Sequence, residues 1–235
     1  MNIYLSKPFV VFSVVFVLVS LCGCSETFMI GDTTLWPPAD QVSDTFPGIT
    51  PPFERIQRLR DLADKSDRMP GEQKQQLSSQ LAAEYQQEGD PLIRLEMLRT
   101  LAHFRTESAA KVLRTAVDDA DTDIRIVACG LWGDWGGPDA VAVLKETFSR
   151  DSDVDVRLAA ARALGATGDS AAISLLGTAL DDPDPAMQVR AVQSLRQVTG
   201  KSFGGDVERW RQYVKGEAPL PPKPVSIADR VRGVF

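Results

Sequence analysis

The chain has 235 residues, of which 43% are apolar and 25% are charged, a composition typical of a globular protein with one or two domains. Its formal net charge is −6, and no stretch gathers the lysines and arginines that non-specific binding to nucleic acid requires. We therefore expect no nucleic-acid partner.

Residues 1–23 differ in composition from the rest of the chain. Lys7 is their only charged residue, and residues 8–21 are apolar apart from two serines. The apolar run is shorter than a typical membrane-spanning helix. Residues 1–23 as a whole have the charged start, apolar middle and small-residue end of a secretory signal. We predict that residues 1–23 form a signal peptide that is absent from the mature protein.

The apolar run ends in "LCGCSE". This stretch resembles the lipobox of bacterial lipoproteins, in which a leucine, a small residue and Gly or Ala precede the acylated cysteine. The resemblance implies a lipid on Cys24, and Ser25 after it implies sorting to the periplasmic face of the outer membrane. An uncleaved anchor or an ordinary secretory signal is the alternative, and either would also export the chain. With Cys24 acylated, Cys129 is a single thiol without a disulfide partner.

Residues 24–52 contain five prolines and show no periodicity, which predicts a disordered tether. Residues 53–89 then carry two apolar rows at helical spacing, separated by "RMPGEQ", so we predict an N-terminal helical hairpin. The first row is Phe53, Ile56, Leu59, Leu62 and Ala63, and the second is Leu77, Leu81, Ala82 and Tyr85.

A recurring phrase begins at Asp90 and returns at Asp121, Asp153 and Asp184, with spacings of 31, 32 and 31 residues. Positions 3, 5, 8 and 11 after each aspartate are mostly aliphatic, and these offsets trace one broad face of a helix. In the first three units a second apolar row follows a break. Each unit is therefore predicted to be a helical hairpin that buries both faces by stacking on its neighbours.

The phrase "D-x-x-[IV]-R-x-x-A-x-x-A-L-G-x-x-G-D", kept best in residues 153–169, resembles HEAT repeats of the short, phycobilisome-lyase-like type. The resemblance covers residues 90–215 and implies an all-α fold, an α-α superhelix of four to five helical hairpins. In the last unit Gln188 takes the arginine position, as an atypical terminal repeat allows. Bilin attachment is not carried over, because a fold alone does not carry a function.

The tail, residues 216–235, has four prolines followed by Ile227, Val231 and Phe235 at i, i+4 and i+8. This spacing favours a short amphipathic helix that could dock on the solenoid or on another protein. A frayed tail is the alternative.

Each unit opens with an aspartate, and in the first three an arginine follows four residues later. The pairs are Asp90 with Arg94, Asp121 with Arg125 and Asp153 with Arg157, whereas Asp184 has no such arginine. We expect the aspartates to cap helices and the arginines to bridge to them or to the next unit's aspartate. A structural Asp/Arg ladder is favoured over a ligand-binding row of carboxylates.

Candidates for metal binding and catalysis are few. "DDADTD" and "DSDVDV" place aspartates alternately, but neither has the glycine at the sixth place and the glutamate at the twelfth that a calcium loop requires. His103 is the only histidine, and the His-Glu dyads of HEAT-fold di-iron enzymes such as deoxyhypusine hydroxylase do not occur. We expect no metal, no cofactor and no catalytic residues.

The segment "CGLWGDWGGPDA" holds two tryptophans between predicted helices. Trp132 falls in a core column, whereas Trp135 lies beyond the periodic face and is the candidate exposed residue for a partner contact. The sequence thus predicts a monomeric, non-catalytic scaffold that binds an unknown protein at the cell envelope. The alternatives are an enzyme or accessory subunit on the same scaffold, either lyase-like or metal-dependent, and a purely structural envelope spacer.

Overall fold

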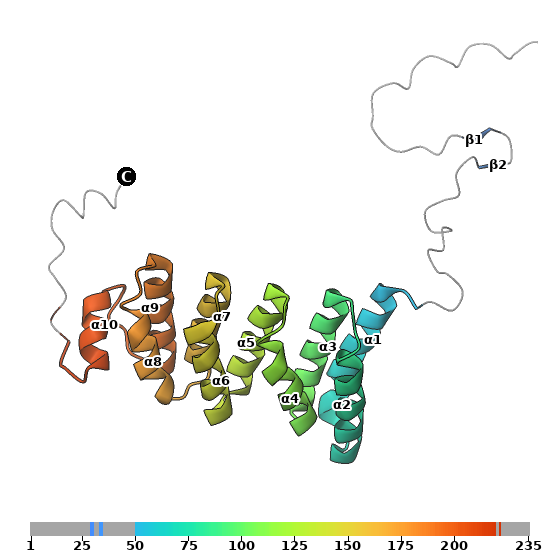
Figure 1. Cartoon of the computed structure of the whole chain (residues 1–235), viewed down its shortest axis with the longest axis horizontal. Coiled ribbons are helices and arrows are strands. Elements are labelled where there is room, and N and C mark those ends of the chain that lie inside the picture. Colours follow the sequence, from blue (N-terminus) through green and yellow to red (C-terminus); the bar gives the residue numbers. More distant parts are fainter. Residues whose placement is uncertain (1–28, 31–32, 35–49, 220, 222–235) are drawn as a thin grey trace, which may run out of the picture. The chain divides into compact units, whose positions relative to one another are not determined.

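The computed structural model describes residues 29–30, 33–34, 50–219 and 221. In residues 50–219, ten α-helices form five hairpins that lie in a row in chain order (Figure 1). A 3-10 turn, η2 (Ser66–Arg68), links the first two helices. The helices are α1 (Pro52–Lys65), α2 (Gly71–Tyr85), α3 (Pro91–Phe104), α4 (Glu107–Ala116), α5 (Thr122–Trp135), α6 (Gly137–Arg150), α7 (Val154–Ala166), α8 (Ala171–Ala179), α9 (Pro185–Thr199) and α10 (Val207–Val214).

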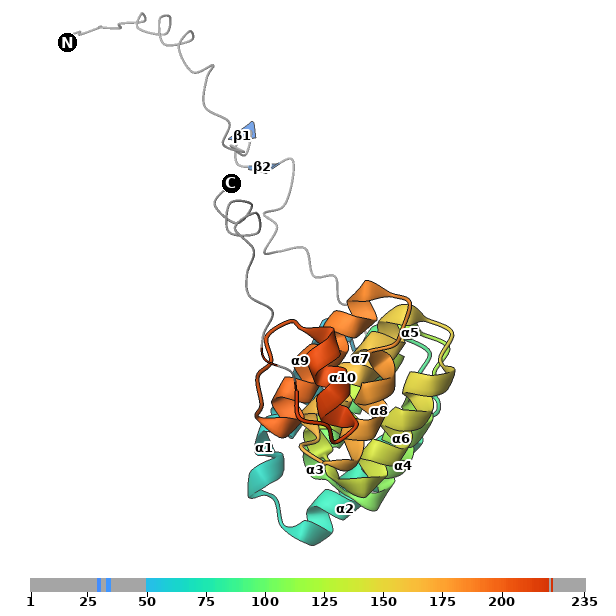
Figure 2. The same cartoon turned by 90° about the vertical axis from the view of Figure 1, so that its left-hand side faces the viewer.

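The first helices of the hairpins pack on one another, α1 on α3, α3 on α5, α5 on α7 and α7 on α9. The second helices form another layer, in which α2 contacts α4 and α8 contacts both α6 and α10. Figure 2 looks along this row from the α10 end. The helical part of the chain is therefore an all-α solenoid, as the sequence period predicts.

The core lies between the two layers and follows the predicted columns. Each unit begins with an aspartate, and the residues that lie 3, 8 and 11 positions after it are buried in all four units. They include the fully buried Leu98, Cys129 and Leu164. Trp132, also in this set, donates its indole N–H to Leu113 O at 3.2 Å. Each hairpin thus contributes the same side-chain positions to one continuous core.

Two predicted core positions lie outside it. Val189 is 56% exposed, because the fifth position after each aspartate lies at the edge of the helix face, and its counterparts in the other units are only partly buried. Phe53 is 69% exposed, and no residue of α1 is buried, because α1 is the first helix of the row. The apolar rows at these two places were wrong about burial.

Small residues let neighbouring first helices approach closely. A Cβ atom on Gly165 would lie 2.7 Å from Cα of Ser194, and one on Gly133 would lie 3.0 Å from Cα of Ala163. Gly165 and Gly133 occupy the same position in α7 and α5. This repeated contact explains why the repeats are rich in small residues.

The last hairpin closes the row with aromatic side chains. Trp210 of α10 is fully buried, and its ring meets those of Phe203 and Tyr213 at centroid distances of 4.8 and 5.8 Å. Residues 198–216 therefore supply α10 as the second helix of the last unit.

Several predicted segments lie mainly outside the described residues. They are the signal peptide, the lipidation site Cys24 and the tail helix over Ile227, Val231 and Phe235. Within residues 24–52, β1 (Met29–Ile30) pairs antiparallel with β2 (Thr33–Thr34). Among the described helices, none has the length and apolarity of a membrane span.

Candidate functional site

An aspartate caps the first helix of each of the last four hairpins. Oδ1 of Asp90 accepts a hydrogen bond from the amide two residues later at 2.9 Å, and Asp121, Asp153 and Asp184 make the same contact at 2.8 Å. Such a cap satisfies an amide that the first turn leaves free and contributes about 1 kcal/mol. These aspartates therefore have a structural partner within their own helix.

In α3 and α5 the arginine four residues after the cap reaches the next hairpin, whereas Arg157 of α7 pairs with none of the described carboxylates. Arg94 Nη2 lies 3.1 Å from Asp119 Oδ1, and Arg125 Nε lies 3.0 Å from Asp151 Oδ2. Both acceptors stand two residues before the capping aspartate of the next helix, so they are not the capping aspartates that we expected to accept. We call these contacts the interhairpin ion pairs.

The side chain at this position, four residues after the cap, also bonds to the loop that precedes its own helix. Arg125 Nη1 donates to a carbonyl oxygen six residues earlier at 2.9 Å, and Arg157 Nη1 does the same at 2.9 Å. Gln188 keeps this bond through Nε2 at 2.8 Å. A neutral amide preserves the local contact but carries no charge with which to extend the interhairpin ion pairs.

The N-terminal hairpin belongs to the same series. Arg55 of α1 pairs with Glu88, which stands two residues before Asp90 as Asp119 stands before Asp121. Glu88 Oε1 also accepts from the Asp90 amide at 2.9 Å. This amide, followed by the Arg55 guanidinium, lowers the pKa of Glu88. The hairpin of α1 and α2 is thus joined to its successor as the hairpins that begin with α3 and α5 are joined to theirs.

Trp135 is half-buried, which corrects the expectation of an exposed side chain. Its indole N–H donates to Ala102 O at 3.0 Å, and its ring meets that of Trp132 edge-on at 5.5 Å. Arg105 lies over this ring, with its Cζ 5.9 Å from the ring centroid, and its Nη2 donates to Asp134 O at 3.0 Å. Trp135 therefore joins α3 to α5, a role within the stack.

Cys129 and His103 are the candidate reactive side chains of residues 50–219. Cys129 is buried, and this burial, with the negative charge of Asp151, raises the pKa of its thiol to about 12. His103 is exposed at the end of α3. In the described part of the chain, no group of three or more His, Cys, Asp or Glu side chains is placed to hold a metal ion.

The solvent face of the first helices repeats one exposed position in every hairpin. This position is nine residues after the cap and is exposed in all five first helices. Because neighbouring first helices pack side by side, these positions form a column along the stack. We call it the first-helix column: Arg60, Arg99, Gly130, Arg162 and Gln193.

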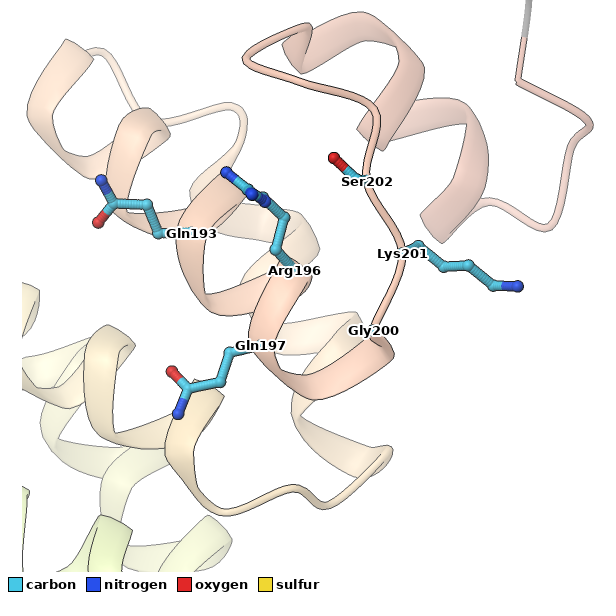
Figure 3. Close-up of a pocket in the computed structure, with 6 residues that line it drawn as sticks. All are labelled: Gln193, Arg196, Gln197, Gly200, Lys201 and Ser202. Carbon is cyan, nitrogen blue, oxygen red and sulfur yellow. The ribbon is translucent and has the colours of Figure 1, made fainter.

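A hollow lined partly by charged groups lies at the end of this column. It has a volume of about 400 Å³ and is lined by α9 and the loop after it. Figure 3 shows Arg196 and the Ser202 hydroxyl on the same side of the loop, with the Lys201 ammonium pointing away. The lining residues are Gln193, Arg196, Gln197, Gly200, Lys201 and Ser202.

A second hollow of about 260 Å³ lies among α1, α2 and α3. Its lining includes the buried side chains of Leu81, Ile93 and Met97, together with polar residues such as Arg58 and Glu84. This mainly aliphatic lining suits apolar packing more than proton transfer.

The chain matches the family model for HEAT repeats at residues 78–153 and 146–206, which together span more than half of its length. The chain belongs to the HEAT-repeat family. A comparison with curated proteins found no match. HEAT repeats stack into solenoids whose extended surfaces commonly bind other proteins. In this HEAT-repeat protein, the first-helix column and the α9 hollow are two candidate surfaces for such binding.

The α9 hollow was missed in the sequence, where Arg196 and Lys201 read as part of an atypical last repeat. One signal was available, because residues 185–199 contain no aspartate or glutamate in a chain whose net charge is −6. That local excess of positive charge marks α9 as different from the other repeats.

Proposed function

We propose that this HEAT-repeat protein is a non-catalytic scaffold that binds a protein partner along its first-helix column. The observation that carries the proposal is the exposure of one equivalent position in each of five consecutive hairpins. Stacked repeats hold these positions at fixed intervals, so a partner meets a preformed surface and little conformational entropy is lost on binding.

We further propose that a lipid on Cys24 holds the scaffold at the cell envelope, on the periplasmic face of the outer membrane. The apolar run of residues 8–21 and "LCGCSE" after it support this placement. Confinement to a membrane raises the local concentration of a scaffold relative to a partner on the same surface. Several acyl chains give stable anchoring where one chain gives only marginal binding.

Site-specific photocrosslinking in intact cells tests the binding surface. A photoreactive residue at Arg162, in the first-helix column, is expected to give one reproducible protein adduct. The matched control is Lys145, which is exposed on α6 in the second layer. Adducts at Lys145 and none at any column position would contradict the proposal.

Substitution of the proposed lipidation site tests the anchor. Cys24→Ser is expected to move the protein from the membrane to the soluble fraction and to lower the adduct yield at Arg162. Cys22→Ser is the control, because residue 22 lies within the proposed signal peptide. If Cys24→Ser leaves the protein membrane-bound at its full mass, the N-terminus is an uncleaved anchor instead.

A further inference from the structure

The solvent face of α9 carries positive charge that the fold does not neutralise. Arg190 and Arg196 lie on this helix, and Lys201 follows it. Within residues 50–219, no carboxylate lies at ion-pairing distance from any of the three. Arg190 makes only a hydrogen bond to Gln193, at 2.9 Å. We call Arg190, Gln193, Arg196 and Gln197 the α9 basic patch.

The arginines of α1, α3 and α5 pair with carboxylates, whereas those of α7 and α9 pair with none of the described carboxylates, so the unneutralised charge gathers toward the C-terminal end of the stack. Glu96 of α3 accepts from Arg60 at 3.1 Å and lies 3.5 Å from Arg99. The equivalent position in α9, six residues after the cap, is Arg190. Glu96 balances two arginines in the α3 repeat, and in the α9 repeat the same position holds the positively charged Arg190.

Helix stability accounts for only part of this charge. A cation in the last turn of a helix interacts favourably with the negative end of the helix dipole, and this explains Arg196 and Lys201. Arg190 lies in the middle of α9, where the dipole contributes little. Within the described residues, neither a carboxylate nor the helix dipole therefore balances the charge of Arg190.

The neutral members of the patch indicate what kind of anion fits it. Gln197 presents an amide N–H donor and a carbonyl acceptor, and Gln193 presents its amide N–H while its carbonyl oxygen accepts from Arg190. A peptide offers both donors and acceptors to such groups, whereas a phosphate ester offers acceptors only. Val189, 56% exposed one turn before Gln193, adds an apolar contact.

We propose that the α9 basic patch binds an acidic segment of a partner protein, with Arg190 and Arg196 on its carboxylates and the two glutamines on its backbone. This inference rests on the proposed scaffold function and names the chemistry of the partner. Paired Arg–carboxylate contacts supply the orientation, because the planar guanidinium matches a carboxylate with two parallel hydrogen bonds.

Fluorescence anisotropy of the full chain in detergent micelles tests the proposal. The probe is a short labelled peptide of alternating Glu and Ala, compared with the same peptide carrying Gln in place of Glu. The double variant Arg190→Gln with Arg196→Gln is expected to weaken binding of the acidic peptide at least about tenfold. The Gln peptide is expected to bind weakly to every form of the protein.

The matched control is Lys145→Gln with Arg150→Gln, which removes the same charge from exposed positions of α6. It is expected to change the affinity less than about twofold, because contacts and not net charge decide binding. Equal losses in the two double variants would overturn the proposal, as would equal binding of the two peptides. Binding to phosphatidylglycerol vesicles with none to the peptide would assign the patch to anionic lipid and also overturn it.

The crosslinking experiment separates this inference from the proposed function. If the Arg162 adduct forms with undiminished yield in the Arg190→Gln, Arg196→Gln background, the scaffold function stands and the acidic-segment inference fails. If the protein with its α9 basic patch unchanged gives no adduct from a photoreactive residue at any position of the first-helix column, the proposed scaffold function itself fails.

Discussion

Asp151 has the most buried carboxylate among the interhairpin ion pairs. Its side chain is 9% exposed and that of Arg125 is 14% exposed, and two of the arginine's nitrogens contact it at 3.0 and 3.4 Å. We expect Asp151→Asn to lower the free energy of unfolding by about 3 kcal/mol, because it leaves Arg125 buried without its anionic partner. Urea denaturation followed by circular dichroism measures the change.

The control for Asp151→Asn is Glu107→Gln in α4. Glu107 pairs with Lys111 at 2.8 Å, but both side chains are at least 70% exposed. Solvent weakens such a pair, and we expect a loss below about 0.5 kcal/mol. Equal effects of the two substitutions would show that burial of the ion pair is not what matters.

Cys129 is expected to be an unreactive thiol in the folded protein. Burial and then the charge of Asp151 raise its pKa to about 12, so the reactive thiolate is scarce at pH 8. In a Cys22→Ser, Cys24→Ser background, a thiol reagent should label residue 129 only after urea is added. An added Ala142→Cys, at an exposed position of α6, should react at once. Rapid labelling of Cys129 without denaturant would contradict this account.

At the residue scale, local contacts could be predicted from the sequence and contacts between hairpins could not. The capping role of Asp121 depends only on the amides that follow it. The acceptor of Arg125 lies 26 residues away, and the acceptor of the Trp135 indole lies 33 residues away. No periodicity within one helix identifies such partners.

At the scale of the helix, close packing makes Gly165 intolerant of a larger side chain. An added Cβ would lie 2.7 Å from Cα and Cβ of Ser194, so α7 and α9 would have to separate. We expect Gly165→Ala to destabilise the protein by about 1–3 kcal/mol, despite the better helix propensity of alanine. Thermal unfolding gives the measurement.

Gly130→Ala is the matched control for Gly165→Ala. Gly130 is exposed within α5, and no atom outside its own helix neighbourhood lies within 4 Å of an added Cβ. Alanine should therefore stabilise the protein there by up to about 1 kcal/mol. Stabilisation by both substitutions would rule out a tight α7–α9 contact.

The positions of the helices could be predicted from the sequence better than the burial of their side chains. Apolar columns spaced 31 and 32 residues apart predict helical hairpins, and the structure has them. Phe53 fits the helical row of α1, but burial needs a neighbour on the far side, and α1 begins the row. Periodicity specifies a face, and only the stack determines what covers it.

At the scale of the whole molecule, the two ends of the stack should differ in stability. No side chain of α1 is buried, whereas α10 inserts the fully buried Trp210. In hydrogen exchange, we expect the amides of α1 to exchange first, those of α9 and α10 later, and those of α5 and α7 last. Protection of α1 equal to that of α7 would contradict this order.

The interhairpin ion pair of α5 has both its donor and its acceptor within residues 121–152. A duplicated copy of residues 121–152, placed before Asp153, would bring its own Arg125 and its own Asp151, so every new junction would find both a donor and an acceptor. The stack can therefore lengthen by tandem duplication in its middle. A copy of the α7 or α9 unit would bring no such pair, because Arg157 bonds to backbone carbonyls and Gln188 carries no charge.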